Sequence, residues 1–588
     1  MKNKTALISL PWHPFDYFSL QIGSLTAAIR SAQLDVTAYH YYKDFIHFIP
    51  GDIYSELHRK SLGEAVFAAL LYPKRFHIIE TELHKKIAHL NLSQVVKGCE
   101  NYLLSIMQQQ NWNDFDIIGF TISHEQLMAS LCLAQRLKNK YPKTSIVFGG
   151  ALLSEITGRG LLLTHPFIDV AVYGEGEQTL LQLVQNNTEE KHSKYDDIKG
   201  IVFRQNKKII VNPPQKLIRN MDELPYPDFS DYFLNDLVQG SSDVLLNIPF
   251  ETSRGCCWGK CVFCNLALQW DNKLRHKSPK RVVDEVRLQV HKYESNKILF
   301  TDTNISASHE SIRKIAKLNL NLRIFAEVSA HISYENFVAL HKSGLRSIQV
   351  GIESFSDYVL KKYNKGTTVM KNLEMLKWCS MLGIDVGYNI IINYPGERPQ
   401  DAIVTLDTMQ YAKNYSAPSI IDYSLSFNSD AFKNMRRHNI SSYKIPSYYR
   451  AIYPKSMLAE CFPLLTLWIK PIPIKKKSIN WQPVKDFVAK WSNEQELARG
   501  KPMLIWRDSG KFLVVETNRS GINDSWILKG LQRDIYLLCD KESAPIEKIS
   551  QETGASKTRI NKAIADLSNH KVLFYHNGRV LSLAVQQC

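Results

Sequence analysis

Four of the chain's ten cysteines lie within nine residues, in the stretch Ser253-Arg-Gly-Cys-Cys-Trp-Gly-Lys-Cys-Val-Phe-Cys-Asn265. Cys257, Cys261 and Cys264 have the spacing C-x3-C-x2-C, and a glycine-containing loop with this spacing can direct three thiolates at one compact object. A tetrahedral zinc site needs a fourth cysteine or histidine nearby, usually in a second pair, and that second pair is missing. The three thiolates therefore predict a [4Fe–4S] cluster that keeps one iron open.

Cys256 adds a fourth thiol to this loop. Because its neighbour Cys257 has the ligand spacing, we interpret Cys256 as a residue that packs beside the cluster or supports it. The reverse assignment, with Cys256 in the ligand position, is an alternative. The sequence itself names no general acid or base.

The bulk composition is that of a globular protein with several domains. A chain of 588 residues is too long to fold around a single hydrophobic core. A content of 44% hydrophobic and 22% charged residues is ordinary for a folded protein. Ten cysteines are too few for a disulfide scaffold, so clustered thiols indicate a metal site in a reducing compartment. The sequence has no long apolar run and no signal peptide at its start, which predicts a cytoplasmic protein without membrane contact.

The formal net charge of +16 has two readings. It suits an anionic partner such as nucleic acid, an acidic peptide or a phosphorylated cofactor, and it equally serves solubility. Charge alone does not decide between them.

Residues 1–198 alternate short apolar runs with amphipathic patterns, which predicts an open α/β sheet of the Rossmann-like kind. Ligands bind at the carboxyl ends of the strands in such sheets. A hairpin and a proline-marked linker are expected over 199–244. The expected strands lie at 5–10, 34–40, 116–123, 145–150 and 168–177, with a helical insertion at about 43–112.

From 245 to 435, six strands alternate with helical patterns and predict a partial (βα)6 barrel of the TIM type. A helical connector is expected over 436–500. The last segment, 501–588, is expected to form an α+β winged-helix-like domain. It holds two hairpins, with turns at Asp508-Ser-Gly and Asn577-Gly, and three short helices at about 525–541, 545–553 and 556–570.

With these elements in place, the cysteine motif resembles that of the radical SAM superfamily, including an aromatic residue, Phe263, immediately before the last cysteine. The resemblance implies that the open iron binds the amino and carboxylate groups of S-adenosylmethionine (SAM), which is cleaved to a 5′-deoxyadenosyl radical. It also implies an external electron donor such as flavodoxin or ferredoxin.

Other positions resemble motifs that contact SAM in this superfamily. "FTDTN", "FAEVSA", "QVGIES" and "GYNIIINYPGE" each end an expected strand. Glu353 and Glu397 have an alternative role as helix N-terminal caps, where carboxylates are favoured. Arg275 and Lys277 are expected to face a carboxylate or a phosphate. The implied SAM-binding residues are Phe263, Asp302, Thr303, Glu327, Ser329, Gly351, Glu353 and Asn389.

The first domain resembles the cobalamin-binding domain that precedes many radical SAM barrels. The D-x-H-x-x-G box that supplies an axial histidine in many cobalamin proteins is absent, so the resemblance implies cobalt without a histidine ligand. A nucleotide-binding sheet is the alternative, although G-x-G-x-x-G is also absent. The implied cobalamin-binding residues are Pro11, Trp12, Ser19, Gln21, Ser123, His124, Gly149, Gly150, Gly174 and Glu175.

Over nearly its full length the chain resembles radical SAM maturases of ribosomally made peptides, the RiPP maturation radical SAM protein 1 family, in pieces such as "LPWHPF", "GEAVFAALLYP" and "GRVLSLAV". The resemblance implies C-methylation of a precursor peptide through methylcobalamin. It departs from the family pattern at 149–158 and 422–432. A rearrangement, a small-molecule substrate or an RNA substrate therefore stays open, and an iron–sulfur DNA-binding sensor ranks last.

The winged-helix-like domain has two expected partners. Lys557, Arg559 and Lys562 on its third helix suit DNA phosphates. The hairpin edge near 511–517 suits an added strand from a leader peptide. Peptide is favoured over nucleic acid because the charge on that helix is modest, and a purely packing domain is the remaining reading.

Overall fold

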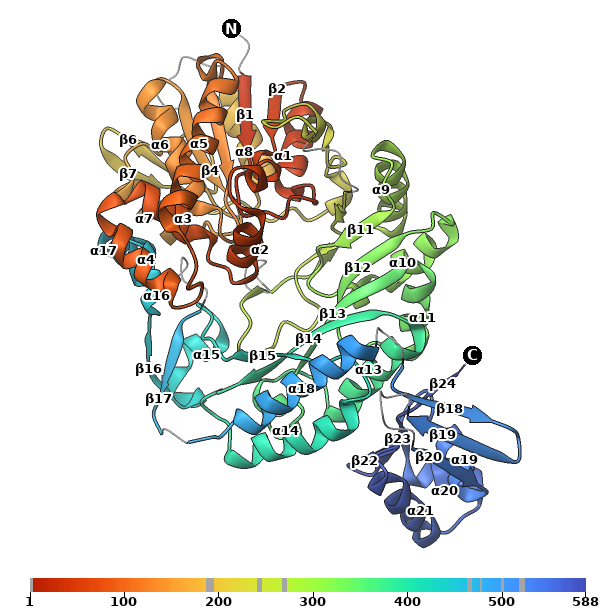
Figure 1. Ribbon diagram of the computed structural model, residues 1–588. Coiled ribbons are helices and arrows are strands. Elements are labelled where there is room, and N and C mark those ends of the chain that lie inside the picture. The colour runs from red at the N-terminus through yellow and green to blue at the C-terminus, as the bar shows by residue number, and fades with distance from the viewer. Residues whose placement is uncertain are drawn as a thin grey trace. The chain divides into compact units, whose positions relative to one another are not determined.

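The computed structural model describes residues 4–186, 195–240, 246–266, 272–462, 468–475, 478–498, 502–517 and 524–587 (Figure 1). Its internal contacts divide the chain into two compact units. The first comprises Met1–Phe250, Arg275–Lys297 and Lys444–Lys470, and the second comprises Glu251–Leu274, Ile298–Tyr443 and Pro471–Cys588. The fold is mixed α/β, as expected, whereas the bounds of the five predicted segments stay predictions.

The first unit is built on a seven-stranded sheet in the order β2-β1-β3-β4-β5-β6-β7. The first five strands pair in parallel, and β6 and β7 add an antiparallel hairpin at the edge. The strands are β1 (Lys4–Ile8), β2 (Asp35–Tyr39), β3 (Ile117–Thr121), β4 (Ser145–Gly149), β5 (Val170–Val172), β6 (Ile201–Gln205) and β7 (Lys208–Val211). Two short strands of this unit, β8 (Ile248–Phe250) and β10 (Arg275–His276), are not part of this sheet.

Both faces of this sheet are buried, which explains why its strands are continuous apolar runs. Successive side chains of a strand point to opposite faces, so Leu7 packs in one hydrophobic cluster and Ile8 in the other. The helices of this unit are α1 (Leu20–Ser31), α2 (Gly51–Arg59), α3 (Gly63–Leu71), α4 (Phe76–His84), α5 (Leu92–Gln109), α6 (Leu127–Lys140), α7 (Glu155–Thr164), α8 (Gly176–Asn186), α9 (Pro279–Lys292), α16 (Ser447–Ile452) and α17 (Lys455–Cys461).

The helices α16 and α17 belong to this first core although they are distant in sequence. Tyr449, Met457 and Cys461 are buried in the same hydrophobic cluster as α3 and α6. The backbone of Glu460 lies so close to Gly160 of α7 that a Cβ there would sit 2.5 Å from its carbonyl oxygen. The predicted connector is therefore helical in this part but is packed into a core.

Two buried carboxyl groups join α3 and α6 by capping each other's helix. Glu64, in the first turn of α3, accepts hydrogen bonds from the N–H groups of Leu127 and Met128 at 2.9 and 2.7 Å. Glu125 accepts one from the N–H of Gly63 at 2.8 Å. Carboxylates satisfy the free N–H groups at a helix start. Burial nevertheless raises the pKa of Glu64 to about 7 and that of Glu125 to about 8.

The raised pKa of Glu125 predicts how stability depends on pH. A carboxyl group whose pKa is higher in the folded than in the unfolded chain holds its proton more tightly when folded, so stability falls as pH rises from about 4 toward 8. Glu125→Gln keeps the acceptor for Gly63 without the charge and should make unfolding in urea less pH-dependent by ~1–4 kcal/mol between pH 5 and 8. An unchanged pH slope would contradict this, and Glu80→Gln, which replaces a carboxylate of α4 in the same unit, is the control.

The second unit contains a parallel sheet whose strands follow the chain order, β15-β14-β13-β12-β11. Serine or threonine side chains cap four of the helices in this unit, and each accepts an N–H bond from the first turn, at Ser333, Ser356, Thr368 and Ser429. The strands are β9 (Ser253–Arg254), β11 (Lys297–Phe300), β12 (Arg323–Val328), β13 (Leu345–Glu353), β14 (Asp385–Ile392), β15 (Ser419–Asp422), β16 (Ile440–Lys444) and β17 (Lys470–Pro473).

Figure 1 shows α13, α14 and α18 beside the strands β13 to β15. Helix α13 ends at Gly383, whose left-handed conformation stops the helix before β14 begins. The helices of this unit up to residue 498 are α10 (His309–Ile315), α11 (Tyr334–Lys342), α12 (Asp357–Lys362), α13 (Val369–Leu382), α14 (Pro399–Ala412), α15 (Asp430–Lys433) and α18 (Gln482–Ala498).

The C-terminal part of the second unit has a four-stranded sheet, β20-β19-β18-β24, and a three-stranded sheet, β21-β23-β22. The two predicted hairpins are present, and so are the three helices, although the first begins at Leu531 rather than near residue 525. The elements are β18 (Leu504–Asp508), β19 (Phe512–Thr517), β20 (Ser525–Lys529), α19 (Leu531–Leu538), β21 (Ala544–Pro545), α20 (Ile546–Thr553), α21 (Lys557–Asn569), β22 (Leu573–His576), β23 (Arg579–Ser582) and β24 (Val585–Gln586).

Two expectations for this part are wrong for the same reason. Residues 525–529 form strand β20 rather than the start of a helix, because Trp526 and Leu528 pair with Val515 and Leu513 of β19. Strand β19 is therefore paired on both sides, and the edge at 511–517 is not free for a peptide. Within the described residues, no helix has the length and apolar character needed to cross a membrane.

Candidate functional site

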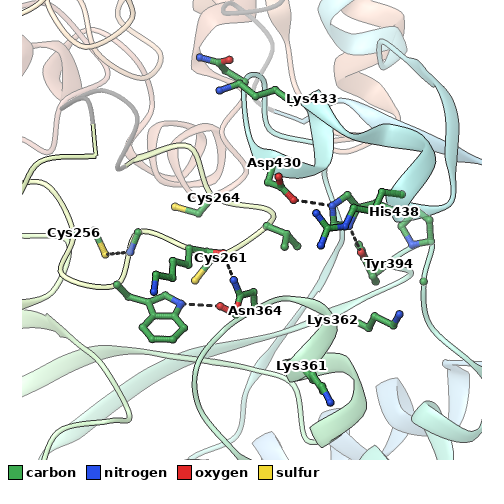
Figure 2. A pocket seen from close by; sticks show the side chains of 18 of the residues that line it. Cys256, Cys261, Cys264, Lys361, Lys362, Asn364, Tyr394, Asp430, Lys433 and His438 are labelled. Carbon is green, nitrogen blue, oxygen red and sulfur yellow. Dashed lines mark hydrogen bonds and ion pairs between the residues drawn. The ribbon is translucent and has the colours of Figure 1, made fainter.

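The cysteine loop follows β9 and borders a cavity of about 1560 Å³ in the second unit (Figure 2). All four thiol residues, Cys256, Cys257, Cys261 and Cys264, line this cavity. The loop turns at Gly255, where φ is +110° and a Cβ would lie 2.4 Å from the carbonyl oxygen of Lys273. Only glycine fits this position, which explains why a glycine precedes the cysteines.

The thiols differ in their surroundings. Cys257 is exposed, and its Sγ accepts a hydrogen bond from Asn304 Nδ2 at 3.1 Å. Cys256 is half-buried and accepts one from the N–H of Gly259 at 3.4 Å. Burial raises the pKa of Cys261 to about 11, and the charge of Cys256 contributes to that rise. Cys256 therefore lies within electrostatic range of Cys261, so the geometry leaves the assignment between Cys256 and Cys257 to experiment.

The donor set fits an iron–sulfur cluster. Among the described residues, no three metal-binding side chains already converge on one point. The three motif thiols nevertheless share one short loop beside a large cavity, and thiolates are the usual ligands of such clusters.

Asp302 and Thr303, which follow β11, hold the cysteine loop in place. The carboxylate of Asp302, only 2% exposed, accepts bonds from the Thr252 N–H at 3.0 Å and from the hydroxyl groups of Thr252 and Ser253, each at 2.6 Å. Thr303 Oγ1 donates to the Gly255 carbonyl at 2.6 Å. Both residues thus support the strand and turn that carry the motif. The predicted SAM contact of each stays a prediction.

Glu353 at the end of β13 pairs with a cation that the sequence did not reveal, and Glu327 at the end of β12 lies within electrostatic range of that cation. Lys365 Nζ lies 2.9 Å from Glu353 Oε1 and is close to the position that a Cβ on Gly351 would occupy. Burial raises the pKa of Glu327, while the charge of Lys365 lowers it. Lys365 follows α12 without any motif, and only the fold brings it to the cysteine loop.

The remaining predicted SAM residues lie in the same unit with fewer recorded contacts. The ring centroids of Phe263 and Tyr363 lie 5.3 Å apart. The Ser329 N–H donates to Asn304 Oδ1 at 3.1 Å, which joins the ends of β11 and β12. Asn389 is half-buried in β14, and no side-chain hydrogen bond links it to the others among the residues described.

The capping alternative for Glu353 and Glu397 does not hold. Helix α12 is capped by Ser356, and Glu353 stands before it with φ at 62° and pairs with Lys365. Helix α14 begins at Pro399, and the carboxylate in its first turn that accepts the Arg398 N–H is Asp401. Glu397 is 1% exposed, and burial raises its pKa to about 8.

Three residues from separate segments form a hydrogen-bonded chain in the cavity wall. Tyr394 Oη lies 2.7 Å from His438 Nδ1, and His438 Nε2 lies 2.9 Å from Asp430 Oδ2 (Figure 2). Tyr394 and His438 are buried, whereas Asp430 is partly exposed. Sequence reasoning missed this chain, because nothing in residues 394, 430 and 438 signals their proximity.

Most predicted cobalamin residues lie at one edge of the first unit's sheet. Pro11 and Trp12 follow β1, Ser123 and His124 follow β3, and Gly150 follows β4, which ends at Gly149. Gly150 has φ at 117°, and a Cβ there would meet the Ile122 carbonyl oxygen at 2.4 Å. Gly174 follows β5 with φ at 82°, and a Cβ at this position would have no described heavy atom within 4 Å. The carboxyl ends of parallel strands thus gather these loops as predicted.

Several of these residues also have structural partners. Trp12 is 3% exposed and packs against Phe45 and Tyr54. Ser19, which precedes α1, donates to Gln21 Oε1 at 3.0 Å. Ser123 Oγ donates to Gln126 Oε1 at 2.6 Å, and burial lowers the pKa of His124.

The predicted basic residues Arg275 and Lys277 do face carboxylates, but those of the protein itself. Arg275 Nη1 binds both oxygens of Glu175, at 2.9 and 3.1 Å. Lys277 binds both oxygens of buried Glu285 at 3.0 Å. The Arg275–Glu175 pair holds the loop after β5, so Glu175 acts here as an internal anchor.

Comparison with known proteins identifies relatives of this chain. Relatives include an uncharacterized methyltransferase of Pyrococcus horikoshii, 27% identical over 55% of this chain and 72% of that protein. Another is the cobalamin-dependent radical SAM methyltransferase TokK of Streptomyces tokunonensis, 26% identical over 29% of this chain and 25% of that protein. The solved radical S-adenosylmethionine methyltransferase TsrM of Kitasatospora setae, with cobalamin and a [4Fe–4S] cluster bound, is 13% identical, covers 74% of this chain and 77% of its own, and has a TM-score of 0.51, which shows a likeness of fold.

The family model "Radical SAM superfamily" matches residues 250–409, a range that includes the cysteine loop and the ends of strands β11 to β14. The match confirms the expected use of a [4Fe–4S] cluster and SAM. Residues 250–409 of this chain are therefore a radical SAM domain.

Proposed function

We propose that this protein is a cobalamin-dependent radical SAM methyltransferase that methylates a carbon atom of a ribosomally made precursor peptide. The observation that carries the proposal is the three-thiol loop at the cavity of the radical SAM domain. The open, glycine-bearing strand ends of the first unit support the cobalamin part, because a flat macrocycle needs close backbone approach. The methyltransferases among its relatives support methylation.

Cys257, Cys261 and Cys264 would hold the cluster, and the loops at Ser123, Gly150 and Gly174 would hold cobalamin. When bound, these groups supply the electron that cleaves SAM and the methyl group that is transferred. The chain's own residues bind and orient these groups. Asp302 fixes the thiol loop, while the Glu353–Lys365 ion pair and the nearby carboxyl group of Glu327 offer charged groups suited to the amino and carboxylate groups of SAM.

The test is anaerobic reconstitution with iron, sulfide and hydroxocobalamin, followed by SAM, reductant and a precursor peptide encoded beside the gene. Mass spectrometry measures 5′-deoxyadenosine, S-adenosylhomocysteine and the peptide mass. A peptide that gains a methyl group, with both products formed, is expected. Deoxyadenosine without S-adenosylhomocysteine would favour a rearrangement, and neither product with an intact cluster would favour a sensor.

We propose that the peptide partner adds as a strand to β20, which is the outer strand of the four-stranded C-terminal sheet. Thr517 N–H donates to the Asp524 carbonyl, so this pair is hydrogen-bonded across the ladder. Hydrogen-bonded pairs alternate along an antiparallel ladder, so the backbone groups of Ser525, Ile527 and Lys529 point away from β19. Ile527 is also 60% exposed, so this edge offers main-chain bonds and an apolar contact.

Proline at 527 tests this placement. Ile527→Pro removes an outward N–H without removing a bond to β19, whereas Ile527→Ala keeps that N–H and loses only the side chain. We expect Ile527→Pro to weaken binding of the fluorescently labelled precursor peptide at least ~10-fold and Ile527→Ala to weaken it less. Equal affinities for wild type and Ile527→Pro would remove the peptide from this edge.

A further inference from the structure

The cavity beside the cysteine loop carries an unbalanced positive charge. Among its described lining residues only Asp430 is acidic, and its carboxylate is bonded by His438 at 2.9 Å and Asn434 at 2.8 Å. Within the described residues, no lysine or arginine side chain of this lining forms an ion pair with a carboxylate, although Arg437 lies within electrostatic range of Asp430. The basic rim is defined as the six exposed cations of this lining, Lys260, Lys361, Lys362, Lys433, Arg437 and Lys475.

The cations come from opposite walls of the cavity. Lys361 and Lys362 lie on α12, and Lys433 lies on α15, on the other side of the cysteine loop (Figure 2). Cys261 and Cys264 line the same space. A charged body seated on the rim is therefore held over the thiols from two sides.

An exposed aromatic residue completes this surface. Trp258, between Cys257 and Cys261, is 37% exposed, and its Nε1 donates to the Asn364 carbonyl at 2.7 Å. Its ring lies so close to Gly366 that a Cβ there would approach within 2.5 Å. A fixed, exposed tryptophan beside unpaired cations is a typical centre for a protein interface.

We propose that the basic rim and Trp258 form the docking surface for an acidic one-electron carrier protein of the flavodoxin class. Opposite charge steers such a protein to the rim, and its cofactor then faces Cys261 and Cys264. A nucleic acid has no need to lie beside cluster thiols, whereas an electron donor must approach them closely. The inference rests on the proposed function, because it assumes the cluster.

The electron balance is complete without another reactant. The flavin hydroquinone anion of the donor loses one electron and becomes the neutral semiquinone, while its N5 proton stays in place. The cluster gains that electron and passes from the 2+ to the 1+ state. No covalent bond changes in this step.

Charge reversal on the rim provides the test, with the reconstituted full chain. The rim variant is Lys361→Glu/Lys362→Glu/Lys433→Glu. The matched control, Lys317→Glu/Lys342→Glu/Lys490→Glu, makes the same charge change at exposed lysines outside the cavity lining. Anisotropy measures binding of labelled flavodoxin as salt is raised, and stopped-flow absorbance measures oxidation of flavodoxin hydroquinone.

We expect the rim variant to bind flavodoxin and accept its electron at least ~10-fold more weakly at low salt, with the difference shrinking as salt increases. The control variant should match wild type. Equal behaviour of the two variants would overturn the proposal, as would loss of RNA or precursor-peptide binding with flavodoxin binding unchanged. Deoxyadenosine formation with dithionite bypasses docking, so its absence in wild type marks failure of the proposed function instead.

Discussion

Cys261→Ala is expected to abolish the cluster and, with it, all formation of 5′-deoxyadenosine. With Cys261 replaced, the loop offers two motif thiolates instead of three, and one cluster iron loses its ligand. Cys256 is the other thiol on this loop that could take the place of Cys261. Iron and sulfide content and the absorbance of the reconstituted protein should fall to background. Deoxyadenosine, measured with dithionite and SAM, should fall to the level of a protein-free reaction.

The pair Cys257→Ala and Cys256→Ala separates the two ligand assignments. The motif spacing predicts that Cys257→Ala behaves like Cys261→Ala, whereas Cys256→Ala keeps its cluster and most of its activity. Because Cys256 is the half-buried thiol with an electrostatic influence on Cys261, the pair is informative in either direction. The reverse pattern would place Cys256 in the cluster and make the ligand spacing C-x4-C-x2-C.

Lys377→Met is expected to release the C-terminal domain from the radical SAM domain. Lys377, on α13, is 0% exposed, and its ammonium group binds Asp540 Oδ1 and the Ser582 carbonyl oxygen, each at 2.8 Å. Trp378 Nε1, from the residue after Lys377, donates a hydrogen bond to the carbonyl oxygen of Lys541, the residue after Asp540. Removing one partner of a buried ion pair leaves the other charge without compensation and costs ~3–5 kcal/mol.

Hydrogen exchange measures this loss, because unfolding of a multidomain chain is not a single transition. Amides of 524–587 should lose protection in Lys377→Met, while the exposed neighbour change Lys541→Met should leave them unaltered. Lys377→Met/Asp540→Asn should lose less than Lys377→Met alone, because the stranded charge is removed too. Equal protection in wild type and Lys377→Met would show that this contact does not hold the domain.

Local patterns predicted much of the fold. The strands at 5–10, 116–123 and 145–150 were recognisable because parallel strands buried on both faces are continuous apolar runs. The hairpin at 573–582 was recognisable because Asn577-Gly578 supplies the left-handed turn that a two-residue connection needs. The strand β20 was missed, because a five-residue run, Ser525–Lys529, shows no distinct period and its pairing with β19 decides its conformation.

The candidate site likewise has features that the sequence predicted and features that only the tertiary structure shows. Three thiols in one loop are a local signal, so the sequence by itself determined the cluster motif and the strand-end positions around it. Lys365 at the loop, the chain Tyr394–His438–Asp430 and the basic rim are products of the tertiary structure alone. Each of these groups combines segments that are distant in sequence, such as residues 361–362 with 433–437 in the rim and residue 394 with 430–438 in the chain. No short-range periodicity encodes which strand ends and helix starts meet. Packing of the sheet and its helices brings these charges together, and that arrangement decides how the thiol loop is held and what can approach it.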